Sequence, residues 1–490
     1  MRKIDQCMNS TKVRGGLKAI LILLLLFFNK MVKSQSALDS IFMLNDTIKT
    51  MSLDEFYKII LTNHPVVQQA SLLGEIAQQE IRLARGNFDP KLVSSFEHKE
   101  FQDKTYYSKL DAYLSFPTWF PVNPKIGYQR NTGDLLHNED LIPGERQLYA
   151  GVSIPIGRGL FTDERRAAVK QAELFKNIAA ADQIKIINKT LLDAAKHYWQ
   201  WYHAYYQYRL SDRGVAIAEE IFKRIKLNAT QGEAAAIDTV QAKITLQSRL
   251  VERQEALLAF QNTGIMISNY LWDEQGEPIQ LDNTIAPVLT TNDQVWLQNE
   301  LLEDLVERAK ENHPELIKLS AKLNQLKVER LLARELLKPQ LDLNYAALSQ
   351  PSAPRNIDLL NNYKVGLDFS FPIFLRKERS KLALAKLKIE NTQFQRNQSE
   401  REIVSEINST FNELRNTITI IAQQEEVVNL YNRLLTSELL NLENGESDLF
   451  KINIQQEKLI QSQSKLLKLM AELQKQKALL FWAAGVQGLK

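Results

Sequence analysis

Residues 363–372 read YKVGLDFSFP, and the stretch at 377–444 that follows contains neither proline nor glycine. Apolar side chains occupy every second position from Val365 to Phe371, which predicts a strand with one apolar and one polar face. The second stretch is rich in Leu, Lys, Glu, Gln and Ile and predicts a single helix, which at 1.5 Å per residue would be about 100 Å long. A strand that leads into so long a helix decides the fold.

The same order of features occurs earlier in the chain. Residues 150–156 alternate in the same way, and residues 163–231 contain no proline and only one glycine, Gly214. Such a repetition at long period predicts an internal duplication. The matching pairs are Asn63-His64-Pro65 with Asn312-His313-Pro314, Ser153-Ile154-Pro155 with Ser370-Phe371-Pro372, Gly232 with Gly445, Asp238 with Asp448, and Trp272 with Trp482.

The first residues predict export. Basic side chains precede an apolar run at 19–28, and small residues follow near Ser34, which is the layout of a signal peptide at 1–34. An uncleaved anchor is the alternative. The only cysteine, Cys7, precedes the apolar run, so the exported chain is expected to hold no disulfide and no zinc-thiolate site.

The rest of the chain divides into two repeats, 35–272 and 301–490, joined by an inter-repeat segment at 273–300. Each repeat is expected to open with two helices that meet at an Asn-His-Pro break. Ser52 and Glu55 have the spacing of a capping box and predict the start of the first helix, with its counterpart at 301–312. The second helix is expected to end near Arg85 in the first repeat and to cover 315–337 in the second. Each repeat ends in a long helical hairpin, at 163–272 and at 377–482.

Four strands per chain are predicted, two within 91–156 and two within 340–373. The first pair is interrupted by an insertion at 102–147, which is interpreted as an extended hairpin or an outer loop. Strands with one apolar and one polar face suit a half-buried soluble sheet or a barrel with lipid outside and water inside. In a barrel, the positions expected to face lipid are Ala150, Val152, Ile154, Val365, Leu367, Phe369 and Phe371.

Four strands cannot close a barrel, and hydrocarbon does not tolerate open sheet edges. The sequence therefore predicts either a barrel assembled from several copies of the chain or strands that lie outside a membrane.

Composition argues against nucleic-acid binding and against catalysis. The chain has 61 basic and 58 acidic residues, but seven basic residues and one acidic residue fall in the predicted signal, so the remainder carries a net charge of −3. No glycine-rich phosphate loop follows a strand, and no histidine and carboxylate cluster has metal-ligand spacing. No nucleic-acid partner, metal, cofactor or enzymatic activity is expected.

The pattern over residues 50–490 resembles the TolC-like outer-membrane efflux protein family, also called outer membrane factors. The resemblance rests on the duplicated order of several short motifs. These are Gly86-Asn87-Phe88-Asp89-Pro90 and Leu337-Lys338-Pro339-Gln340-Leu341 before strands, Pro155 and Pro372 at strand ends, the Gly232 to Asp238 turn, and the inter-repeat stretch Leu271–Pro287.

The resemblance implies a mainly α-helical fold with a membrane β-barrel. Each chain would supply a duplicated unit of helix, β-hairpin and long helical hairpin, and three chains would form a 12-stranded barrel above a helical periplasmic tunnel. The chain would lie in the outer membrane of a Gram-negative bacterium. The implied partners are two further copies of the chain, a HlyD-like periplasmic adaptor and an inner-membrane RND or ABC transporter.

Within this family resemblance, the turns of the helical hairpins lie at the periplasmic tip. A pore constriction is implied at Asp238 and Asp448, and Lys451 occupies a place where the family often has another aspartate. Lys451 could pair with Asp448 and weaken an acidic ring. The alternative is that both aspartates only cap the following helices. The expected adaptor contacts are Gly232, Glu233, Ala236, Gly445, Glu446 and Ser447.

An aromatic run at 197–208 is the other conspicuous motif. Consecutive helical residues point in all directions, so packing between helices is favoured over a flat substrate surface.

The predicted function is therefore a trimeric exit duct of a tripartite efflux pump or type I secretion system, opened at its periplasmic tip by the adaptor. The alternative is a periplasmic coiled-coil adaptor or scaffold without a channel. The sequence leaves the cargo open.

Overall fold

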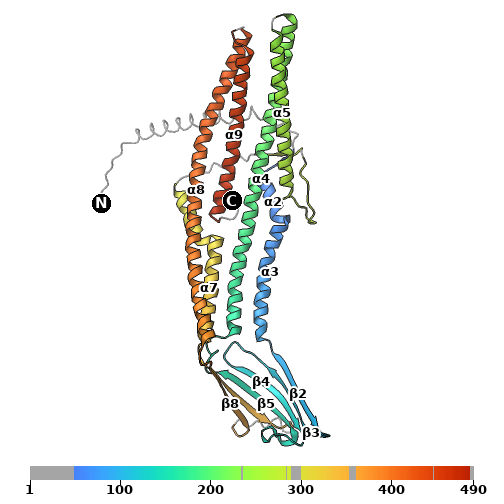
Figure 1. Cartoon of the computed structure of the whole chain (residues 1–490), viewed down its shortest axis with the longest axis vertical. Coiled ribbons are helices and arrows are strands. Elements are labelled where there is room, and N and C mark those ends of the chain that lie inside the picture. The colour runs from blue at the N-terminus through green and yellow to red at the C-terminus, as the bar shows by residue number, and fades with distance from the viewer. Residues whose placement is uncertain are drawn as a thin grey trace, which may run out of the picture.

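The structure is a computed structural model in which long helices run side by side and a sheet lies at one end of them (Figure 1). It describes residues 49–232, 235–282, 284–288, 299–351, 360–444 and 446–485. The predicted signal at 1–34 therefore lies outside the described residues.

The first half contains two short helices, four strands of one sheet, and a long helical hairpin. Its elements are β1 (Thr50–Met51), α2 (Leu53–Asn63), α3 (Pro65–Arg85), β2 (Lys91–Phe101), β3 (Lys104–Ser115), β4 (Asn123–Thr132), β5 (Arg146–Pro155), α4 (Glu164–Gln231), α5 (Ala236–Ser268) and β6 (Ala286–Pro287).

The second half has the same order but only two strands of that sheet. Its elements are α6 (Asn299–Asn312), α7 (Pro314–Glu335), β7 (Gln340–Ser349), β8 (Tyr363–Ser370), α8 (Arg376–Glu443) and α9 (Leu449–Ala483). Both long helices, α4 and α8, have 68 residues, which confirms the predicted length of about 100 Å. Within the described residues, no helix is both long and apolar enough to cross a bilayer.

All six long strands belong to one antiparallel sheet in the order β2-β3-β4-β5-β7-β8. The prediction of four strands was wrong, because the insertion at 102–147 supplies β3 and β4. Residues 104–132 do form a hairpin, but it lies within the sheet between β2 and β5 instead of outside it as a loop. Gln102 and Asp103 both have positive φ (54° and 57°), which suits the tight two-residue turn between β2 and β3.

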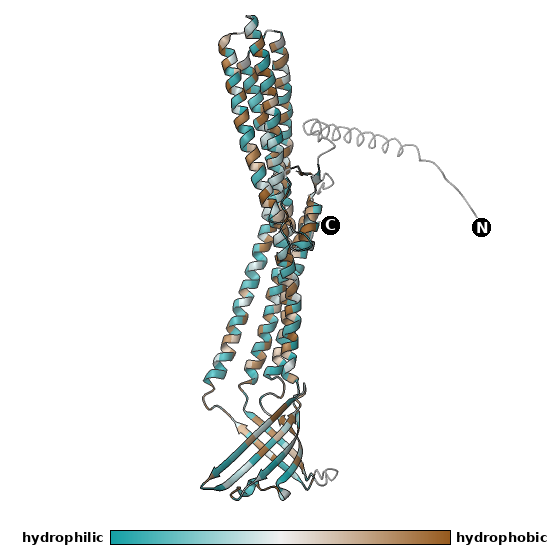
Figure 2. Cartoon of the chain, turned by 90° about the vertical axis from the view of Figure 1, so that its right-hand side faces the viewer, coloured by the Kyte–Doolittle hydropathy of each residue, from teal (hydrophilic) through white to brown (hydrophobic). Residues whose placement is uncertain are grey.

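The aromatic run packs between helices, as predicted. Tyr198 and Trp201 are fully buried among residues from α2, α4, α5 and α9. The Tyr198 hydroxyl lies 2.8 Å from the Met51 carbonyl oxygen and accepts a hydrogen bond from the Val288 N–H at 3.1 Å. It therefore ties the short β1–β6 pair to the middle of α4, where Figure 2 shows a short segment against the side of the helices.

The start of α2 confirms the predicted capping box. The Ser52 hydroxyl accepts from the Glu55 N–H at 3.2 Å, and the Glu55 carboxylate accepts from the Ser52 N–H at 2.9 Å. The two Asn-His-Pro breaks also act as caps. The Nδ1 atom of His64 accepts from the Val66 N–H, and that of His313 from the Glu315 N–H, both at 3.2 Å.

We expect His64→Ala and His313→Ala each to lower the free energy of unfolding by about 1 kcal/mol, the usual contribution of a cap. Burial lowers the pKa of both histidines, so each ring is neutral and can accept at neutral pH. A lowered histidine pKa gives stability that is complete above the unfolded value near 6.5 and is lost as the pH falls through the folded value. Thermal unfolding in detergent should show this loss.

His137→Ala is the matched control for these variants. His137 precedes a short helix at Asn138–Asp140 without a side-chain cap bond, and its side chain is exposed. An equal stability loss in this control, or a loss at His64 that does not change with pH, would contradict the cap interpretation.

Candidate functional site

The sheet has one apolar and one polar face, and every strand contributes to both. The register carries Leu92 through Leu114 to Ile126, and separately Ile154 through Leu343 to Leu367, on the apolar face. Exposed residues on this face include Leu92, Phe96, Ile126, Val365, Leu367 and Phe369. The positions Ala150, Val152 and Ile154 share this face, and Phe371 lies just beyond the end of β8.

Charged and polar side chains cover the opposite face. Tyr149 packs over the position of Gly127, where an added Cβ would lie 2.4 Å from the tyrosine ring. The Tyr149 hydroxyl donates to Asp111 at 3.0 Å, and the Lys125 ammonium lies 5.9 Å from the ring centroid. This network joins β3, β4 and β5, so the polar face is organised across the inserted strands as well.

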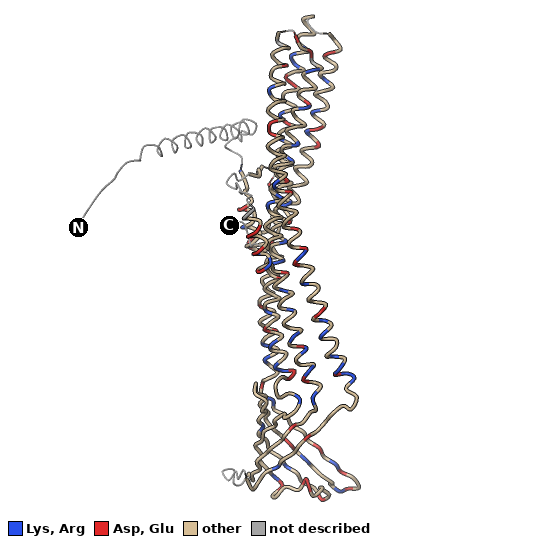
Figure 3. Tube along the Cα trace, turned by 90° about the vertical axis from the view of Figure 1, so that its left-hand side faces the viewer, with Lys and Arg blue, Asp and Glu red and all other residues tan. Residues whose placement is uncertain are grey.

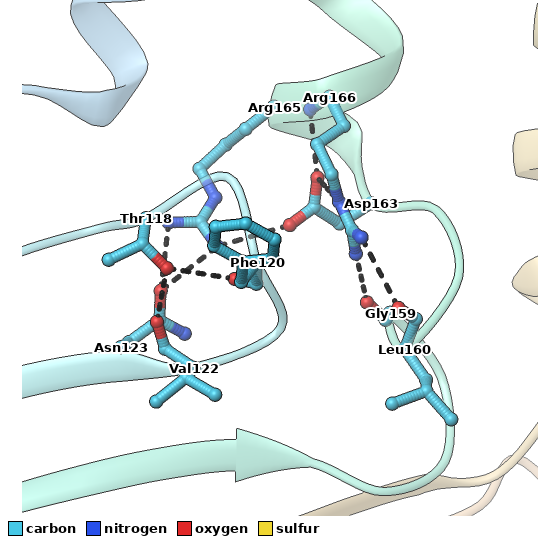
Figure 4. A network of polar contacts seen from close by, with 9 residues as sticks. All are labelled: Thr118, Phe120, Val122, Asn123, Gly159, Leu160, Asp163, Arg165 and Arg166. Atoms are coloured by element: carbon cyan, nitrogen blue, oxygen red, sulfur yellow. Dashed lines mark hydrogen bonds and ion pairs between the residues drawn. The ribbon is translucent and has the colours of Figure 1, made fainter.

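The sheet meets the helices through a polar network at the start of α4 (Figure 4). Asp163 caps α4 by accepting from the Arg166 N–H at 2.8 Å, and its carboxylate also pairs with Arg165 at 3.1 Å. The buried Arg166 guanidinium donates to the carbonyls of Gly159 and Leu160.

Arg165 extends this network to the inserted hairpin. Both of its terminal nitrogens donate to Asn123 Oδ1 at 3.2 Å, and its guanidinium lies 5.4 Å from the Phe88 ring centroid. Phe88 in turn contacts Trp119, with ring centroids 5.5 Å apart. The connection between β3 and β4 is therefore held against Phe88, which follows α3, and against Arg165 on α4, at the helical end of the sheet.

The turns of the helical hairpins lie at the opposite end of the molecule (Figure 1). In the first, Gly232 ends α4 with φ of 81°, which confirms the predicted left-handed glycine. Ala236 is the first residue of α5, and Glu233 lies outside the described residues. The prediction that Asp238 caps α5 was wrong, because the cap residue is Ala235 and Asp238 lies within the first turn.

The second turn is built differently. Asp448 caps α9 and accepts from the Lys451 N–H at 2.9 Å, so the bond between these two residues comes from the Lys451 backbone. Ser447 donates to Glu438 at 2.6 Å, while the Glu446 N–H donates to the Asn441 carbonyl. Gly445 lies outside the described residues.

A buried ion cluster joins the two helical hairpins, and sequence reasoning missed it. The Arg249 side chain on α5 is only 6% exposed and pairs with Glu252 at 2.7 Å and with Glu457 on α9 at 2.5 Å. Gln207 on α4 accepts from the Ser464 hydroxyl on α9 at 2.8 Å nearby. The i, i+3 spacing of Arg249 and Glu252 is visible in the sequence, but the partner on α9 is 208 positions away.

No group of three or more potential metal ligands occurs among the described residues. Figure 3 shows acidic and basic residues interspersed along the helices, which is typical of solvated helix faces. The arrangement offers a two-faced sheet and long helices, and so it can line a passage.

Comparisons with known proteins agree with this arrangement. Residues 305–486 match the family model described as outer membrane efflux protein. No curated protein matches the sequence at a significant level.

Several solved structures share the fold. CusC, from a study of folding and transmembrane channel formation, has a TM-score of 0.65 and 14% identity, over 90% of this chain and 93% of CusC. The CmeC outer membrane channel of Campylobacter jejuni has a TM-score of 0.63 and 13% identity, over 88% of this chain and 85% of CmeC. The open MtrE channel of Neisseria gonorrhoeae has the same TM-score and identity, over 89% of both chains.

Proposed function

Because the chain belongs to the outer membrane efflux protein family, we propose that it is the outer-membrane exit channel of a tripartite efflux system. It is a duct and not an enzyme, and it lies in the outer membrane and extends into the periplasm. The single observation that carries this function is the sheet with one continuous apolar face and one charged face, set on the end of a helical bundle.

The duct is assembled from three copies of the chain. Among the described residues of one copy, the edge strands β2 and β8 each have a neighbour on one side only. Unpaired backbone groups in hydrocarbon cost several kcal/mol each, so only a closed barrel suits a lipid environment. The apolar positions from Ala150 to Ile154 and from Val365 to Phe371 then face lipid, and the charged face lines the water-filled interior.

The partners at the periplasmic end are a HlyD-like adaptor and an inner-membrane RND or ABC transporter. The adaptor contacts the hairpin turns, at Gly232, Glu233 and Ala236 and at Gly445, Glu446 and Ser447. The residues 35–272 and 301–490 act as two similar halves, joined by the inter-repeat segment at 273–300. Transport energy comes from the transporter, since the described chain offers no site for hydrolysis.

Asp238 and Asp448 form acidic rings at the tip, with Lys451 beside the second ring. In a trimer each position occurs three times, and three carboxylates about 10 Å from the axis attract a cation by roughly 1 kcal/mol at low salt. Asp238 is the cleaner test, because it caps no helix and its replacement removes charge alone.

We expect Asp238→Asn to lower the cation preference of the purified channel in planar bilayers about fivefold at low salt, because roughly 1 kcal/mol of cation attraction is lost. Asp448→Asn should act in the same direction while keeping its cap, since asparagine caps as well as aspartate does. Glu220→Gln on the exposed flank of α4 is the matched control. Unchanged selectivity in both aspartate variants would refute the acidic rings but would not contradict the proposed channel function.

The competing function is a periplasmic scaffold without a channel. A channel should fractionate with outer membranes and resist unfolding on a gel until heated. Release of the protein by osmotic shock would favour the scaffold and overturn the proposed function.

A further inference from the structure

The inserted hairpin changes the size of the barrel that this chain can build. We propose that each copy contributes all six strands, so that three copies close an 18-stranded barrel in which β8 of one copy pairs with β2 of the next. This inference rests on the proposed function, because it concerns the wall of that channel. A barrel of eighteen strands is about one and a half times as wide as one of twelve, since diameter grows roughly linearly with strand number.

The side-chain pattern places β3 and β4 in the wall. Leu110, Ala112 and Leu114 of β3 and Ile126 of β4 continue the apolar face in register with β2 and β5. An outer loop surrounded by water would not need apolar side chains aligned on one face with those of the neighbouring strands. On the opposite face, the bond from Tyr149 to Asp111 crosses from β5 to β3 over Gly127 of β4.

Both ends of the inserted hairpin are consistent with full-length strands. β3 pairs with β2 from Phe101 and Lys104 down to Lys91 and Ser115, next to the helices. After β3, Trp119 contacts Phe88, which follows α3, and Asn123 at the start of β4 accepts a hydrogen bond from Arg165 on α4. The hairpin therefore reaches the same helical end of the sheet as the other strands do.

The stagger of the sheet fits a barrel wall. Starting at Lys91, the residue of β2 nearest the helices, directly paired residues lead across the sheet to Lys364 of β8. The successive partners are Lys91, Ser115, Lys125, Gly151, Ala346 and Lys364. From Lys364, β8 continues six residues farther toward the helices, to Ser370. Six residues rise about 20 Å, and five strand spacings cover about 24 Å. The resulting tilt of about 40° lies within the 35–45° of closed barrels, and Figure 2 shows the strands running obliquely to the helices.

The free edges are complementary to each other. The sheet is antiparallel throughout and has an even number of strands, so β2 and β8 run in opposite directions. A second copy can therefore add its β2 to β8 and continue the same antiparallel order. All of β2 and all of β8 except Gly366 are exposed in the single chain, as expected for strands that a neighbouring copy covers.

The test places single cysteines on the full-length chain, with Cys7→Ser as background, and labels them with an environment-sensitive fluorophore. Leu110→Cys in β3 and Ile126→Cys in β4 report the apolar face, and Lys109→Cys and Gln129→Cys report the polar face. Val365→Cys and Lys364→Cys in β8 are the matched controls. The channels are reconstituted in phosphatidylcholine vesicles with or without brominated acyl chains, and aqueous iodide is the second quencher.

We expect brominated lipid to quench labels at 110, 126 and 365, and iodide alone to quench those at 109, 129 and 364. If iodide alone quenched the labels at positions 110 and 126 while brominated lipid still quenched the label at 365, the hairpin would lie outside the bilayer. That result would contradict the 18-stranded barrel but not the channel function. Loss of lipid quenching at 365 as well would overturn the proposed function itself. Native mass measurement in detergent must also give three copies, and any other number overturns the count of eighteen.

Discussion

Removing both carboxylates around Arg249 should loosen the two helical hairpins from each other and raise the resting conductance of the channel. Glu252→Gln with Glu457→Gln leaves a guanidinium that is 6% exposed without any counter-charge. Within the described residues, its Nε atom has no hydrogen-bond partner. Breaking a buried ion pair from one side costs about 3–5 kcal/mol, and we expect a loss of that order in unfolding experiments in detergent.

Arg249→Met should cost less than the double glutamine variant. Methionine fills most of the vacated volume, and the carboxylates of Glu252 and Glu457 are more than 40% exposed and can be hydrated. We expect about 1–2 kcal/mol, chiefly from repulsion between the two carboxylates. This ordering distinguishes a buried cation from a simple surface salt bridge.

Arg253→Met is the matched control, because Arg253 lies one turn further along α5 and pairs with Asp212 at 3.5 Å in an exposed position. It should change stability by less than about 1 kcal/mol and leave conductance unchanged. If the double glutamine variant behaved like this control, the Arg249 cluster would not hold the hairpins together.

Asp163→Ala should separate the sheet from the start of α4. The variant removes the cap of a 68-residue helix and the carboxylate that pairs with both Arg165 and Arg166. The cap contributes about 1–2 kcal/mol, and the loss of the ion pairs adds about 1–3 kcal/mol, reduced by partial exposure of the site. The heat-resistant band of the proposed trimer should dissociate on gels at a lower temperature than that of the wild type.

Asp163→Asn isolates the charge, because asparagine can still cap the helix. Burial raises the pKa of Asp163, but the Arg166 N–H and the two guanidinium groups outweigh it, so the net pKa is lowered. A lowered carboxyl pKa gives stability that is complete above the unfolded value near 3.9 and disappears as the pH falls through the folded value. The difference between wild type and Asp163→Asn should therefore be full at pH 7 and shrink below about pH 4.

Glu164→Gln tests whether any acidic residue in this turn has the same effect, since Glu164 is exposed in the first turn of α4. Its loss should change stability by only a few tenths of a kcal/mol through the helix dipole. An Asp163→Asn variant as stable as Glu164→Gln at neutral pH would show that the junction does not depend on this carboxylate.

Sequence reasoning recovered the elements that depend on neighbouring residues. The capping box at Ser52 and Glu55, the left-handed Gly232, and the two 68-residue helices all follow from local patterns. The alternation from Val365 to Phe369 likewise identified a strand and its faces. Local periodicity and caps act over a few residues, so one sequence contains the whole signal.

The same reasoning failed where the outcome depended on distant partners. The alternation of Leu110, Ala112 and Leu114 was visible in the sequence, but it did not show whether these residues pair within the sheet or project from it. Asp238 and Asp448 both lie near the start of the returning arm of a helical hairpin, yet only Asp448 caps a helix.

By itself, the sequence determined the order of the helices, the lengths of the helical arms, and the position and faces of four strands of the sheet. Only the tertiary structure decided that the insertion adds two strands to the sheet and that Arg249 on α5 meets Glu457 on α9. The reason is physical: backbone conformation and amphipathic period are set by adjacent side chains, whereas strand pairing and buried ion pairs are set by whichever distant segments can satisfy their edges and charges together.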